Sequence, residues 1–143
     1  MEVNQKLEKA KEAILHRDSA TASEIYHAII AVHPQHVDAW NGLGAVAFEK
    51  GELEESLRCY RKAHDFAMAE FGGKYPRQLV WIEVHKPALR ALHGIGLNLY
   101  RLGRIKEAQE IFENMLQLNP VDDQGVKFLL NDIKKGSVLW KKK

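Results

Sequence analysis

The amino-acid sequence predicts an all-α protein built as a stack of helix-turn-helix repeats. Residues 37–68 and 89–120 align without a gap and share five identities, namely Ala39 with Ala91, Gly42 with Gly94, Gly44 with Gly96, Gly51 with Gly103 and Glu55 with Glu107. Helix-forming residues fill the periodic segments, and β-branched runs of alternating polarity are nearly absent. Glycine and proline separate the apolar stripes at regular intervals. These three observations indicate a repeated helical unit.

The composition is that of a soluble globular chain. Of the 143 residues, 45% are apolar and 28% are charged. No stretch approaches the ~18 continuous apolar residues of a membrane span, and the charged start lacks the apolar core of a secretory signal. The lone Cys59 has no partner for an internal disulfide and is expected to be a small buried side chain. We therefore expect a cytoplasmic protein with no membrane contact.

The charge pattern argues against nucleic-acid binding. The net charge is +2, and the basic residues are spread along the chain except for the final three lysines. Phosphate binding needs several cations on one face. No nucleic-acid partner is expected, although the basic tail leaves it as a weak third option that steep salt dependence of binding would reveal.

The first helix pair is predicted over residues 2–16 and 19–33. Asp18, Ser19 and Thr21 all have side chains that can cap the second helix, and the sequence does not choose between them.

Two further pairs follow, over residues 37–50 with 53–70 and 87–102 with 105–118. Gly51 and Gly103 mark their turns. A seventh helix is predicted over residues 123–135, because Pro120 ends the preceding helix, Asp122 can cap the next one and Gly136 suits its end.

The repeats share one length, and a single insertion interrupts them. Val3, Val37 and Leu89 begin equivalent segments. The step from Val3 to Val37 is about 34 residues, which is the length of a helix-turn-helix repeat of the tetratricopeptide type. The step from Val37 to Leu89 is longer, and its excess corresponds to the segment at residues 69–86.

The residues at marked positions also resemble the tetratricopeptide repeat family. The middle repeat has Trp40, Leu43, Gly44, Tyr60 and Ala63, the last has Leu92, Ile95, Gly96, Ala108, Phe112 and Pro120, and the first keeps Ala10, Ala22, Tyr26 and Pro34. The first repeat departs from the pattern with Lys6 and Lys9, and the middle repeat has Met68 in place of the terminal proline, so its second helix is expected to run on to about Phe71.

The resemblance implies one domain over residues 1–143, a right-handed superhelical stack of about seven helices. Its repeats cover residues 3–36, 37–70 and 89–122, and a capping helix at 123–135 precedes a tail at 136–143. Gly44 and Gly96 would let the two helices of a pair cross closely, and Tyr60 and Phe112 would fill the space beside them.

The insertion at residues 69–86 is expected to be a short helix or an ordered loop packed on the stack. A lone strand within "QLVWIEV" would have no partner. Trp81 and Ile82 are expected to be its buried anchors, and the alternative is a segment that folds over one edge of the groove and shapes it.

The resemblance also implies which side chains line the concave surface, because the first helix of each pair faces inward. The expected peptide-binding residues are Asn4, Lys11, Asp38, Asn41, Phe48, Glu49, Arg90, His93, Leu97, Tyr100 and Arg101. Phe48 and Tyr100 are expected to be exposed anchors. The alternative is that several of these residues, Leu97 among them, pack between adjacent repeats instead.

Two sharper functions are not supported by the residues. A clamp for a carboxy-terminal carboxylate is disfavoured, because Gly42 and Gly94 stand where the family's clamp has polar side chains and only Arg90 fits. His33 and His36 resemble half of a metal site without further ligands at suitable spacing. We expect no metal, no cofactor and no enzymatic activity.

The expected function is a protein–protein interaction scaffold whose groove binds a peptide or helical segment of a partner. The alternative is structural self-association as a homodimer or larger oligomer, through the outer face or through the apolar "SVLW" segment with Trp140.

Overall fold

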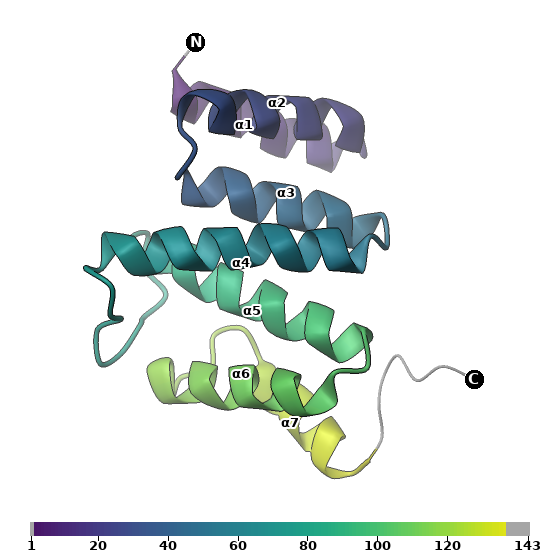
Figure 1. Ribbon diagram of the computed structural model, residues 1–143, viewed down its shortest axis with the longest axis vertical. Coiled ribbons are helices and arrows are strands. Elements are labelled where there is room, and N and C mark those ends of the chain that lie inside the picture. The colour runs from purple at the N-terminus through teal and green to yellow at the C-terminus, as the bar shows by residue number, and fades with distance from the viewer. Residues whose placement is uncertain (1, 137–143) are drawn as a thin grey trace.

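The protein is a stack of helices that follow one another in chain order. A computed structural model describes residues 2–136, and within them the helices are α1 (Val3–Leu15), α2 (Ser19–Val32), α3 (Val37–Glu49), α4 (Leu53–Glu70), α5 (Lys86–Arg101), α6 (Ile105–Leu118) and α7 (Val126–Lys134). The stack runs from the α1–α2 pair at the top of Figure 1 to α6 and α7 at the bottom. The described residues contain no strand, and the predicted all-α repeat stack is confirmed.

Each helix packs on the next one in sequence, and α3 also packs directly on α5. Because this contact skips α4, it brings the first helices of successive repeats to the same side of the stack. Such stacking buries the apolar face that a single helix pair leaves uncovered.

Local capping explains where two of the early helices begin. The side chain of Asp18 accepts a hydrogen bond of 3.1 Å from the backbone N–H of Thr21, so Asp18 is the cap among the three candidates. His36 begins α3 in the same way, because its Nδ1 accepts from the backbone N–H of Ala39 at 3.2 Å. Gly51 and Gly103 follow α3 and α5 in left-handed conformations, with φ of 76° and 82°.

Helix α7 begins three residues later than predicted. Gly125 has a left-handed backbone conformation, with φ of 70°, and this turn comes directly before the first residue of α7. Asp122 nevertheless acts at this start, because its carboxylate accepts from the backbone N–H groups of Val126 at 2.7 Å and Lys127 at 3.0 Å. The helix therefore spans Val126–Lys134 rather than 123–135.

The core has the close helix crossings that the glycines predict. A Cβ atom added at Gly96 would lie within 3.0 Å of the ring of Phe112, and one added at Gly44 would lie within 3.0 Å of the ring of Tyr60. Phe112 is fully buried. These two glycines therefore set the spacing within the second and third helix pairs.

Gly42 makes a similar contact between repeats, against the ring of Tyr26 from α2. We expect Gly42→Ala to reduce the free energy of unfolding by about 1–2 kcal/mol, because overpacking of about 1–3 kcal/mol outweighs the gain of up to ~1 kcal/mol in helix propensity. In a Tyr26→Leu background the clash is removed, and the same substitution should be neutral or stabilising. Urea denaturation of the four proteins measures this, and destabilisation of equal size in both backgrounds would contradict the packing.

The insertion is an ordered loop, residues 71–85, between α4 and α5. The prediction that Trp81 and Ile82 anchor it is wrong, because they are 37% and 47% exposed. The anchor is Leu79, which is fully buried against α5 and α4 residues and donates its backbone N–H to the carbonyl of Leu118 at 2.7 Å. The side chain of Asn119 returns a bond to the carbonyl of Leu79 at 2.9 Å.

Within residues 2–136 no helix has the length and apolar character that crossing a membrane requires. The proposed contacts of Trp140 and the apolar tail lie outside the described residues.

Candidate functional site

A cavity of about 320 Å³ lies on the side of the stack where the first helices of the repeats meet. Helices α1, α3 and α5 contribute to its lining, together with the end of the 71–85 loop and two tyrosines from α2 and α4. We call this cavity and the helix faces around it the inner groove. Six of the sequence-predicted residues line it, namely Lys11, Asp38, Asn41, Arg90, His93 and Leu97.

Two tyrosines form part of the cavity lining, and sequence reasoning did not place them there. Tyr26 and Tyr60 come from the second helices of their repeats, and their rings reach the cavity beside Gly42 and Gly94. Burial raises the pKa of Tyr60 to about 12 and also raises the pKa of Tyr26. Both phenols are therefore neutral at physiological pH and can donate or accept a hydrogen bond.

Asn41 is a buried polar side chain of the cavity lining, at 8% exposed. Its Nδ2 donates to the backbone carbonyl of Pro87 at 2.9 Å, which ties α3 to the start of α5. Its Oδ1 has no hydrogen-bond partner within residues 2–136. A buried acceptor without a partner is costly, and this atom has essentially no exposed surface that a bound donor could contact.

The charged groups around the cavity differ in whether they are paired. Lys11 pairs with Glu8 at 3.7 Å, and Glu83 of the loop pairs with Lys86 at 3.0 Å. The guanidinium of Arg90 lies over the ring of Trp81, 5.6 Å from its centroid. Lys11 and Arg90 are both exposed, and Arg90 has no ion pair within the described residues.

Two groups of the lining carry no such pairing. Asp38 is half-buried and forms no ion pair with any residue of 2–136. Burial lowers the pKa of His93, so its ring is uncharged at neutral pH. Among the described residues, the cavity lining therefore carries two carboxylates, Asp38 and Glu83, and two cations, Lys11 and Arg90.

The loop supplies part of the cavity wall through Glu83, next to Pro87 at the start of α5. Two cations lie near the ring of Trp81, Lys86 at 5.5 Å and Arg90 at 5.6 Å from its centroid. The loop therefore borders the cavity, and the alternative that it folds over one edge of the groove and shapes it stays a prediction.

Three predicted residues lie beyond the cavity, toward the carboxyl ends of α3 and α5. Arg101 lies over the ring of Phe48, with its Cζ 5.1 Å from the centroid, and Phe48 is half-buried. Glu49 is exposed at the end of α3. These residues are adjacent to the cavity lining in sequence, but they do not contribute to it.

The prediction that Tyr100 is an exposed anchor is wrong. Tyr100 is 1% exposed and belongs to the core between α5, α6 and α7. Its hydroxyl donates to Oδ2 of Asp132 at 2.6 Å, a residue of α7. The capping helix covers this position in the last repeat, which explains why an inward position of the family pattern is buried here.

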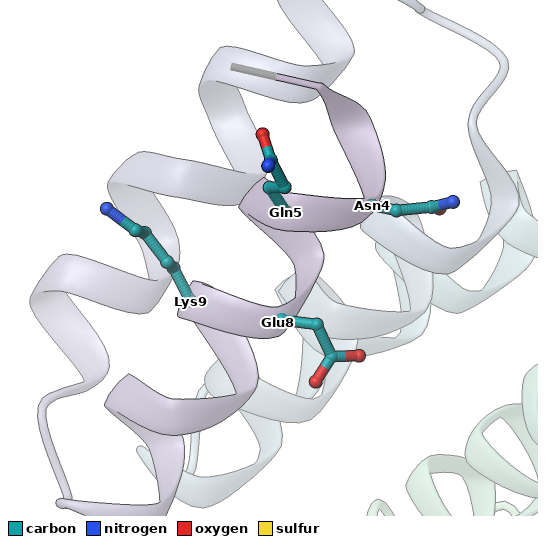
Figure 2. A pocket seen from close by; sticks show the side chains of 4 residues that line it. All are labelled: Asn4, Gln5, Glu8 and Lys9. Carbon is teal, nitrogen blue, oxygen red and sulfur yellow. The ribbon is translucent and has the colours of Figure 1, made fainter.

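Asn4 lies in a different depression, near the start of α1. This depression is larger, about 570 Å³, but its lining consists of Asn4, Gln5, Glu8 and Lys9 alone, all exposed. Figure 2 shows these four side chains extending from α1 in different directions without converging on a common point. The smaller cavity, formed by several elements, is therefore the better candidate site.

Two residues of types that often bind metals or react, His36 and Cys59, have structural roles here. The ring Nδ1 of His36 is used to cap α3, and no group of three metal-ligating side chains occurs in the part of the chain that the structure describes. Cys59 is buried in the core of the first two repeats, and burial raises the pKa of its thiol to about 11. Such a thiol is a poor nucleophile at neutral pH.

Comparison with known proteins agrees with the repeat pattern. Two tetratricopeptide repeat models match the chain, one over residues 7–69 and one over residues 89–122. The chain is also 31% identical over 99 residues to the protein named "Protein CTR9 homolog" of Arabidopsis thaliana. That match covers 69% of this chain and 8% of the plant protein, so the chain spans only a small part of the length of this relative.

Proposed function

Because the chain belongs to the tetratricopeptide repeat family, whose repeats generally mediate contacts between proteins, we propose that the inner groove binds a segment of another protein. The observation that carries the proposal is the convergence of α1, α3, α5 and the loop on one cavity. No single repeat would form this cavity, so the groove is a product of the stacking.

An extended peptide suits the cavity better than a helix. Its 320 Å³ lie near the lower end of the ~300–1,000 Å³ typical of ligand pockets. The hydroxyls of Tyr26 and Tyr60 offer hydrogen bonds that an extended backbone can use, whereas a helix has already paired its own backbone groups. We therefore propose that the partner contributes an extended segment, which forms hydrogen bonds with polar groups of the groove.

Filling the groove should weaken this binding. Ala45 lines the cavity on α3, and Ala45→Trp places an indole there. The probe is a set of heptapeptides selected from a random displayed library on the wild-type protein, with affinity measured by fluorescence anisotropy. We expect the variant to bind them at least about tenfold more weakly, a loss of ~1.4 kcal/mol.

The matched control is Ala28→Trp, which adds the same indole to an exposed position of α2 outside the cavity. This variant should bind the peptides like the wild type, and thermal melting checks that both variants fold. Equal loss of affinity in both variants, or in neither, would show that the peptides bind elsewhere.

Self-association is the second candidate function. Exposed apolar side chains at both ends of the stack favour it. Leu15 is 82% exposed at the α1 end, and Phe128 is 65% exposed on α7 at the other end. Exposed apolar side chains at opposite ends can join copies of the protein head to tail. The groove proposal needs no such contact, so we expect light scattering to give a monomer mass at every concentration. A mass that rises with concentration and returns to the monomer in a Leu15→Lys/Phe128→Lys variant would favour the second candidate.

A further inference from the structure

We propose that the hydroxyls of Tyr26 and Tyr60 bind backbone amides of the bound segment, so that the inner groove recognises main chain rather than one particular side chain. This inference rests on the proposed function, and it names the residues that recognise the segment and the chemical group that they bind. It follows from two phenols that line one cavity, have no hydrogen-bond partner within residues 2–136 and retain exposed surface.

Both tyrosine rings lie directly against glycines of the inner helices. Tyr26 comes from α2 and Tyr60 from α4, and both line the cavity together with Gly42 and Gly94. A Cβ atom added at Gly42 would clash first with Cζ of Tyr26, the ring carbon that carries the hydroxyl. A Cβ atom added at Gly94 would clash with the ring of Tyr60. Each ring therefore occupies the space of a missing side chain on the inner helices, with the hydroxyl as its outermost atom.

The two hydroxyls are unpaired and accessible. Neither forms a hydrogen bond with any residue of 2–136. The buried side-chain atoms that lack both a partner and exposed surface are Oδ1 of Asn41, the hydroxyl of Tyr75 and Oδ1 of Asn98. Since the hydroxyls of Tyr26 and Tyr60 are not among these enclosed atoms, both retain surface that a ligand in the cavity can contact.

The charges of the lining favour an uncharged ligand group. The lining carries two carboxylates and two cations, namely Asp38, Glu83, Lys11 and Arg90. It therefore has no net charge that would select an acidic or a basic side chain. A neutral phenol both donates and accepts a hydrogen bond, and every non-proline residue of an extended segment presents one N–H donor and one carbonyl acceptor. The backbone amide is thus the group that matches both hydroxyls.

Removing the hydroxyls should separate binding from stability. Tyr26→Phe and Tyr60→Phe keep the rings, and each should bind the selected heptapeptides about threefold to tenfold more weakly, the range for one neutral hydrogen bond. The midpoint of urea denaturation should stay the same or rise, because a buried hydroxyl without a partner is costly. Peptides of unrelated sequence should lose affinity alike, since all of them share the main chain.

Ester replacement of single peptide bonds in a selected heptapeptide identifies the amide that is bound. An ester has no N–H, and its carbonyl is a weaker acceptor than that of an amide. At one or more positions the ester should lower the affinity for the wild-type protein about threefold to tenfold. The same ester should have no effect on the Tyr26→Phe/Tyr60→Phe protein, because the hydroxyls that contact that bond are gone.

Tyr75→Phe is the matched control, because it removes an unpaired hydroxyl from a tyrosine that does not line the cavity. It should leave the peptide affinity unchanged. Peptides that lose affinity to Ala45→Trp but bind the Tyr26→Phe/Tyr60→Phe protein like the wild type would overturn this inference and leave the proposed function intact. A loss confined to peptides that share one side chain would do the same. A library that yields no binding peptide, or peptides insensitive to Ala45→Trp, would overturn both.

Discussion

Replacing Phe112 by alanine is expected to lower the free energy of unfolding by about 3–5 kcal/mol. Phe112 is fully buried in the core that joins α5, α6 and α7, and its ring fills the space that Gly96 leaves open on α5. The substitution removes that ring while the helix crossing keeps its geometry, so a cavity remains. The shift in the midpoint of urea denaturation, at unchanged slope, measures the effect.

Phe128→Ala is the matched control for this prediction. Phe128 lies on the neighbouring helix α7 but is 65% exposed, so its loss should change stability by no more than about 0.5 kcal/mol. A Phe112→Ala protein as stable as the Phe128→Ala protein would show that α5 and α6 do not cross as described.

Replacing Leu79 by alanine is expected to reduce stability by about 2–5 kcal/mol, the range for a fully buried leucine. Leu79 is the apolar anchor of the 71–85 loop, and its backbone N–H bonds to the carbonyl of Leu118 at 2.7 Å. Losing the anchor should also raise the hydrogen-exchange rate of that amide. Urea denaturation gives the stability, and exchange followed by NMR gives the local opening.

Val80→Ala serves as the control, because Val80 is the next residue of the loop and is exposed. It should leave both the stability and the exchange of the Leu79 amide near wild-type values. If Leu79→Ala and Val80→Ala behaved alike, the loop would not be held by Leu79, and its place at the edge of the groove would need another explanation.

The helices were predictable because their ends depend on local chemistry. Asp18 as a cap, and Gly51 and Gly103 in left-handed turns, act within a few residues of their own position. The start of α7 was predicted less well, since Asp122 caps it only after the chain has turned at Gly125. That extra turn depends on a backbone conformation that the apolar pattern does not reveal.

Burial at the groove was less predictable because it depends on which elements lie above each position. Tyr100 occupies an inward position of its repeat, yet α7 covers it. Trp81 is the largest side chain of the loop, but Leu79 is the residue that packs against α4 and α5. The backbone N–H of Leu79 also bonds to the end of α6. Residue type alone does not distinguish these cases.

The tyrosines of the cavity had a signal that pattern reasoning overlooked. Gly42 and Gly94 were recognised as departures from a polar clamp, but their small size also leaves room for the rings of Tyr26 and Tyr60. Each of these two glycines has no side chain, and a tyrosine ring from the preceding repeat occupies the space beside it. Pairing each such glycine with an aromatic residue of the preceding helix would have identified both tyrosines.

The crystal structure of the protein bound to one of the selected heptapeptides tests the central claim most directly. We expect the peptide to lie extended along α1, α3 and α5, in contact with the residues that line the cavity. A peptide bound on the outer faces of α2, α4 and α6, or at either end of the stack, would contradict the account.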